Sequence, residues 1–130
     1  MELLALLLLA AVPLAGAWYA RAYAPRHTWL FTGVALGLVI SPLSLGLYST
    51  FFLSPLGFPT GMLGLVSTLF HGAPGYQFAL WLGVVPPNEV VRGVGHVYIE
   101  LLNGVFWAAI YGILGFIVDW ARLVHSRRVS

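Results

Sequence analysis

The hydrophobic pattern of the chain consists of three long apolar runs and one region where proline and glycine interrupt apolar stretches. The first run covers residues 3–23, and the second covers residues 28–52 without a single charged side chain. The third starts with polar residues at 88 and stays apolar to about residue 122. Each run reaches the roughly 20 residues that a helix needs to cross the hydrocarbon core of a bilayer. The pattern predicts three transmembrane helices, at about 3–23, 28–52 and 88–122.

The region between the second and third predicted helices, residues 53–87, is apolar but discontinuous. Its two best apolar pieces, 60–71 and 76–85, are too short to span a bilayer. Non-helical backbone at membrane depth has to be covered by protein, because lipid cannot satisfy its polar groups. We therefore expect an ordered outer cap, in the form of a re-entrant or interfacial helical hairpin, instead of a fourth span.

The composition is typical of a membrane protein. Of the 130 residues, 60% are hydrophobic and 8% are charged, whereas a soluble domain has about 25% charged residues. The chain is predicted to be an all-α integral membrane protein with one transmembrane domain, residues 1–130, that ends in a tail at 123–130. The first apolar run follows the acidic Glu2 instead of a basic residue, so we expect a retained helix. The small residues Ala15, Gly16 and Ala17 keep a cleaved signal peptide open as the alternative.

The arginines predict the topology. Arg21 and Arg26 lie between the first two predicted helices, and Arg122, Arg127 and Arg128 follow the third. Three spans place both groups on one side, which the positive-inside rule makes cytoplasmic. The N-terminus is then outside and the C-terminus inside a membrane that we expect to be the bacterial cytoplasmic (inner) membrane. The basic residues are too few and too dispersed for a nucleic-acid interface.

A polar stripe occupies the start of the third predicted helix. Its members recur every three or four residues and therefore share one helix face; they are Glu89, Arg92, His96, Glu100 and Asn103. A histidine and a glutamate four residues apart can bind a metal or relay a proton. The favoured interpretation is a local network of mutually satisfied charges near the lipid headgroups, because the chain has no second motif to complete a metal site. The same register continues through Trp107 and Tyr111.

His71 ends the first apolar piece of the cap. It could contact a cofactor, either as a bis-imidazole haem ligand together with His96 or beside a quinone. The alternative is a histidine that stabilises the C-terminus of its own helix. No cofactor, metal site or catalytic residue is expected, since the sequence has no cysteine and no hydrolase, zincin or nucleotide-binding motif. Asp119 is expected to pair with Arg122 at the inner membrane face.

Small residues recur every four positions in the second and third predicted helices. This spacing lets two helices approach closely in lipid; the residues are Gly33, Gly37 and Ser41 in one helix and Gly104, Ala108 and Gly112 in the other. We expect these faces to pack against a helix of this chain, of a second copy or of another membrane subunit.

Three hypotheses for the function follow. The first is a non-catalytic accessory, assembly or stabilising subunit of a larger membrane complex, for example an energy-transducing one. The second is a small membrane enzyme, or a haem-, quinone- or metal-binding protein, that uses His71, His96 and Glu100. The third is an immunity protein that neutralises a partner in the membrane. Besides the lipid bilayer, the expected partners are membrane-protein subunits or a second copy of the chain.

Overall fold

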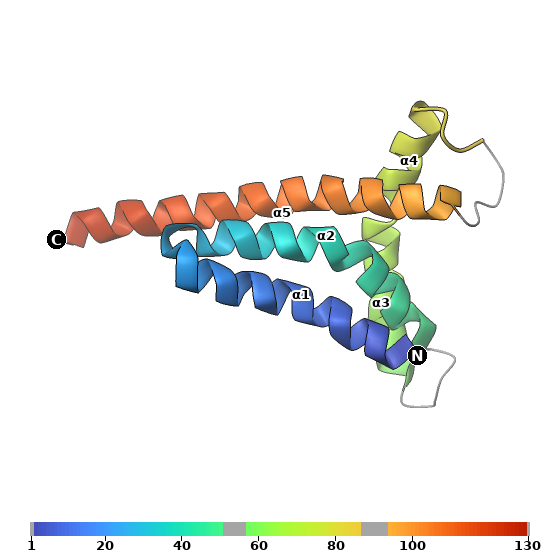
Figure 1. The fold of residues 1–130 in the computed structure, drawn as a ribbon, viewed down its shortest axis with the longest axis horizontal. Helices are drawn as coiled ribbons and strands as arrows, with labels where there is room; N and C mark the ends of the chain where they lie inside the picture. The colour runs from blue at the N-terminus through green and yellow to red at the C-terminus, as the bar shows by residue number, and fades with distance from the viewer. Residues whose placement is uncertain (1, 51–56, 87–93, 130) are drawn as a thin grey trace.

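The computed structural model describes residues 2–50, 57–86 and 94–129 (Figure 1). Its helices are α1 (Glu2–Tyr23), the short 3-10 helix η1 (Pro25–His27), α2 (Thr28–Ser49), α3 (Gly57–His71), α4 (Ala73–Trp81) and α5 (Val94–Val129). The described residues contain no strand. The prediction of an all-helical chain is therefore confirmed.

Three helical segments are long and apolar enough to cross a membrane: Leu6–Tyr23, Pro25–Ser49 and Gly95–Ser126. This confirms the prediction of three such helices. The predicted ends at 51–52 and 88–93 lie outside the described residues. At its other end, α5 continues to Val129 through residues that the sequence analysis assigned to a tail, because no glycine or proline interrupts the chain there.

The three long helices lie side by side in one layer, with α2 in the middle (Figure 1). The middle helix contacts α1 on one side and α5 on the other, and it also contacts α3. The start of α1 and the end of α5 lie towards opposite ends of this layer (Figure 1). The helix α2 is therefore the centre of the packing.

The helices α3 and α4 follow each other across one end of the layer (Figure 1). They do not fold back on each other as the predicted hairpin would. The joining residue, Gly72, keeps a helical backbone (φ −81°, ψ −29°), and its N–H donates to the carbonyl of Thr68 at 2.8 Å. The chain therefore continues forward instead of reversing. As a result α3 packs on α2, whereas α4 packs on α5.

Small residues allow the backbones of α2 and α5 to touch. A Cβ atom at Gly33 would overlap the carbonyl group of Tyr111, and one at Gly37 would overlap the backbone of Ala108. From the other helix, a Cβ at Gly104 would lie 3.0 Å from the carbonyl oxygen of Leu38. Two helix backbones can approach this closely only where glycine leaves room for the neighbouring helix. In lipid, where apolar side chains gain nothing from leaving water, such close packing is what favours helix association.

The two small-residue faces therefore pack against each other inside one chain. Ser41 is buried in the same interface, with 4% of its surface exposed, and a Cβ at Gly112 would lie 2.9 Å from Val34 Cγ2. Neither face is left as a docking surface for another subunit.

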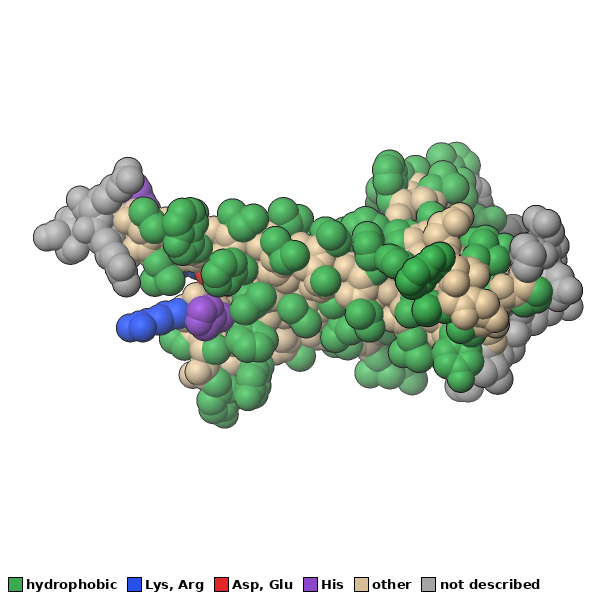
Figure 2. Space-filling model, turned by 90° about the horizontal axis from the view of Figure 1, so that it is seen from above, with side chains coloured by type: hydrophobic (Ala, Val, Ile, Leu, Met, Phe, Trp, Pro, Cys, Tyr) green, Lys and Arg blue, Asp and Glu red, His purple; other side chains and the backbone are tan. Residues whose placement is uncertain are grey.

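The interior of the protein is small and partly polar, and large apolar side chains point outward. The largest fully buried side chains are those of Asn103 and Ser44, whereas Trp81 is 81% exposed and Leu14 is 71% exposed. Apolar side chains cover much of the face shown in Figure 2. A water-soluble fold of this size would instead bury such side chains. The distribution suits a protein whose solvent is lipid.

Candidate functional site

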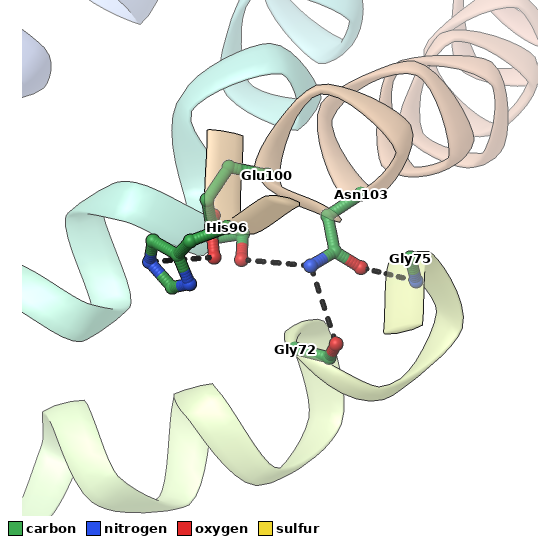
Figure 3. A network of polar contacts seen from close by, with 6 residues as sticks. Gly72, Gly75, His96, Glu100 and Asn103 are labelled. Atoms are coloured by element: carbon green, nitrogen blue, oxygen red, sulfur yellow. Dashed lines mark hydrogen bonds and ion pairs between the residues drawn. The ribbon is translucent and has the colours of Figure 1, made fainter. Parts of the chain in front are cut away.

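Asn103 on α5 lies at the crossing between the long helices and the α3–α4 pair (Figure 3). Its side chain has no exposed surface. Its Oδ1 accepts a hydrogen bond from the N–H of Gly75 at 2.5 Å. Its Nδ2 donates to the carbonyl of Gly72 at 3.2 Å and to Ser41 Oγ at 3.3 Å. One amide therefore links α2, α5 and the junction of α3 with α4.

The contact with Gly75 acts as a helix cap. Gly75 lies in the first turn of α4, whose N–H groups have no partner within the helix. The residue at the α4 N-cap, Gly72, supplies no capping side chain, so Asn103 supplies the acceptor from another helix.

Asp119 performs the same task for α2. Its carboxylate accepts from the N–H of Trp29 at 3.3 Å and from the N–H of Leu30 at 2.9 Å. These are first-turn groups, and the local N-cap residue, His27, makes no side-chain capping bond. Asp119 is only 4% exposed, and its negative charge lies at the positive end of the helix dipole.

The expected pair of Asp119 with Arg122 is therefore wrong. The described residues contain a single carboxylate contact within ion-pair distance, and it joins His96 to Glu100. Local spacing suggested Arg122 as the partner of Asp119, but two unsatisfied backbone N–H groups of α2, far away in sequence, are closer.

His71 lies in a chain of hydrogen bonds that joins α3 to α2 and α5. Its Nδ1 is 2.8 Å from the carbonyl oxygen of Ser67, so Nδ1 must carry the proton. In the neutral ring Nε2 then accepts from the Tyr111 hydroxyl at 2.6 Å. On the other side, Ser44 Oγ donates to the carbonyl of Ile40 at 2.5 Å and therefore accepts from Ser67 Oγ at 2.6 Å. Each hydroxyl or ring N–H named in this chain has an acceptor.

This chain of hydrogen bonds ends on a backbone carbonyl. A carbonyl oxygen has no proton to pass on, so the arrangement suits a fixed link between helices better than a proton relay. Trp107 strengthens the link, since its Nε1 donates at 3.0 Å to the carbonyl of His71 at the α3 C-terminus. The Trp107 and His71 rings lie 4.6 Å apart.

The structure does not bring His71 and His96 together as the haem hypothesis would require. His71 contacts Trp107 and Tyr111, and both of its ring nitrogens are hydrogen-bonded. The described contact of His96 is with Glu100 (Figure 3). An iron ligand at His71 would have to break its bond with Tyr111.

Glu100 and His96 form a polar pair on α5 whose hydrogen-bonding capacity is only partly used. Glu100 Oε1 lies 3.9 Å from His96 Nε2, whereas Glu100 Oε2 is buried and has no hydrogen-bond partner. Both residues line a groove of about 280 Å³ between α2 and α5, whose other walls include Leu38, Pro42 and Leu101. An unpartnered carboxylate oxygen beside an apolar groove can accept a proton or a cationic ligand.

The other two members of the polar stripe, Glu89 and Arg92, lie outside the described residues. Within the described part of the chain, no group of three or more metal-ligating His, Cys, Asp or Glu residues occurs. The structure thus divides the predicted stripe into Asn103, which is fully hydrogen-bonded, and the His96–Glu100 pair, which is not.

Comparisons of this chain with protein-family models, with curated proteins and with solved structures found no match.

Proposed function

We propose that this protein is a non-catalytic accessory, assembly or stabilising subunit of a larger membrane complex. The observation that carries the proposal is how α5 uses its polar side chains. Asn103, Trp107 and Asp119 each satisfy a backbone group at the end of another helix. Polar side chains within a membrane helix ordinarily mark a reaction or transport pathway, but these three are occupied in holding α2, α3 and α4 in place.

The distribution of charge along α5 supports a membrane-spanning position. At about 1.5 Å per residue, the stretch from Glu100 to Asp119 is about 29 Å long, close to the ~30 Å thickness of the hydrocarbon core. The His96–Glu100 pair then lies near one boundary, and Asp119 and Arg122 lie near the other. We place Arg21, Arg26 and Arg122 at the cytoplasmic face of a bacterial inner membrane, as the positive-inside rule directs.

This position puts the α3–α4 pair at the outer boundary, because Asn103 joins it to α5. The pair then lies along the membrane plane as interfacial helices. Its outward side chains are large and apolar; the most exposed are Leu63, Leu69, Phe70 and Trp81. A surface of this kind is suited to lipid and to the apolar flank of another membrane subunit, and it is the part of the protein that we assign to partner contact.

The test compares cells with and without the protein. Affinity purification in mild detergent should yield a complex of fixed stoichiometry, identified by mass spectrometry. Deleting the protein should then lower the amount of assembled complex while leaving the turnover of each remaining complex unchanged. A complex that assembles in full without the protein but has lost its turnover would contradict the accessory role.

Glu100 favours a second candidate function, that of a ligand- or proton-binding membrane protein. The carrying observation is the buried Oε2 atom without a partner beside His96. The substitution Glu100→Gln keeps the shape of the side chain and removes its charge, so it should leave assembly intact under either hypothesis. If Glu100 is structural, the variant complex should keep its turnover.

A matched variant separates folding from chemistry. Glu100→Leu removes all hydrogen-bonding capacity and should lower assembly if the pair is structural. A Glu100→Gln complex that assembles normally but has lost its turnover would establish the second function over the first.

A further inference from the structure

A groove opens between α1, α2 and α5 at the end of the layer that carries the arginines. It encloses about 540 Å³, which lies in the range of small-molecule sites. Arg21 from α1 and Arg122 from α5 both line it, together with the apolar or aromatic side chains of Ala17, Trp29 and Val118. Two guanidinium groups from different helices therefore meet one partly apolar hollow.

Neither guanidinium group is neutralised within the described part of the chain. The ion pair found there joins His96 and Glu100, at the opposite end of α5. Asp119 is the carboxylate nearest in sequence to Arg122, but it is bonded to backbone N–H groups of α2 and does not line the groove. Both arginines are exposed, so their charge is available to a ligand.

The threonines of the groove do not contribute donors. The hydroxyl of Thr28 donates to the carbonyl of Pro25 at 3.1 Å, and that of Thr32 donates to the carbonyl of Thr28 at 2.7 Å. The charged hydrogen-bond donors offered to a ligand are thus the two guanidinium groups, and the indole N–H of Trp29 is a neutral one. A guanidinium group can donate two parallel hydrogen bonds to a pair of oxygen atoms. Carboxylate and phosphate groups both offer such a pair.

We propose that this groove binds the headgroup of an anionic phospholipid. The phosphate lies between Arg21 and Arg122, and an acyl chain leaves along Ala17, Trp29 and Val118. The inference rests on the membrane position proposed above, but not on the accessory role. At that position the groove lies at the bilayer boundary, where basic pockets between transmembrane helices meet anionic headgroups. Trp29, 46% exposed, is of the residue type that favours this depth.

The larger neighbouring groove provides a matched control. It encloses about 830 Å³ and shares Arg122 with the proposed site. Arg26 lines this larger groove but not the smaller one. Removing the charge of Arg26 therefore changes the net charge of the same membrane face without changing the proposed site.

The test is lipid titration of the purified full-length protein by native mass spectrometry. Phosphatidylglycerol should bind about tenfold more tightly than phosphatidylcholine, because both lipids carry the phosphate but the choline cation is repelled by the two guanidinium groups. Arg21→Gln and Arg122→Gln should each remove this preference, and Arg26→Gln should keep it. Circular dichroism of each variant checks that it folds. We expect it to fold, because these arginines are exposed and make no ion pair within the described part of the chain.

Three results would overturn the proposal. Equal binding of the two lipids by the unmodified protein would already contradict it. An equal loss in Arg26→Gln would show diffuse attraction by net charge instead of a site. Displacement of phosphatidylglycerol by millimolar inorganic phosphate would show a site for soluble anions. Since the titration uses the isolated protein, failure of the accessory role would leave its outcome unaffected.

Discussion

Replacing Asn103 with leucine should lower the stability of the protein more than any other single polar substitution on α5. The side chain is fully buried and makes three hydrogen bonds, to Gly75, Gly72 and Ser41. Leucine has the same branched shape and is somewhat larger, so the substitution removes the hydrogen bonds without opening a cavity. The N–H of Gly75 and the carbonyl of Gly72 would then lose the partners that Asn103 supplies.

The magnitude follows from these three bonds. Interhelical hydrogen bonds in membrane proteins contribute on average about 0.6 kcal/mol each, whereas bonds in water-soluble proteins contribute about 0.5–1.5 kcal/mol. Three bonds therefore amount to about 2–4 kcal/mol. The Gly75 bond should lie towards the upper figure, because it caps α4 and the local N-cap residue, Gly72, has no side chain that could replace it.

The assay is reversible unfolding in mixed micelles at increasing SDS content, followed by tryptophan fluorescence. A control substitution, Gln77→Leu, removes an amide of the same kind from the exposed surface of α4 and should change the free energy of unfolding by less than about 0.5 kcal/mol. If Asn103→Leu unfolds at the same SDS content as the unmodified protein, the amide does not hold the helices together and the capping argument fails.

Three further substitutions test the remaining contacts in the same assay. Asp119→Ala should cost about 1–2 kcal/mol, since it uncaps α2, and a neutral effect would show that water already satisfies that helix end. Trp107→Phe keeps an aromatic ring but loses the bond to the α3 carbonyl, so it should cost about 1 kcal/mol. Gly37→Leu should prevent the contact of α2 with α5 and abolish folding, whereas Ala109→Leu on the exposed face of α5 should be tolerated; equal effects would contradict the packing.

The long helices could be predicted from the sequence because each is a local feature. Apolar length alone determines whether a helix can span a bilayer, and glycine at every fourth position marks a face that packs closely. The register that runs from Asn103 through Trp107 to Tyr111 also indicated one functional face. In the structure all three side chains of this face contact α3, α4 or the residue between them.

The partners of these side chains could not be predicted, because they are far apart in sequence. Asp119 bonds to Leu30 across most of the chain, and no local spacing distinguishes that contact from a pair with Arg122. The hairpin was expected for residues 53–87 because glycine and proline divide this region into apolar pieces too short to span a bilayer. Gly72 instead adopts a helical conformation, so the two short helices continue across the layer.

Cysteine labelling tests the membrane arrangement most directly, since the chain has no native cysteine. Single cysteines would replace Val84, which follows α4, and Ser126, near the end of α5; both positions are exposed. With a maleimide that cannot cross the membrane, intact spheroplasts should be labelled at position 84, and position 126 should react only after permeabilisation. Labelling of both positions from outside would contradict the three-span arrangement that places α3 and α4 on one side of the bilayer and the arginines on the other.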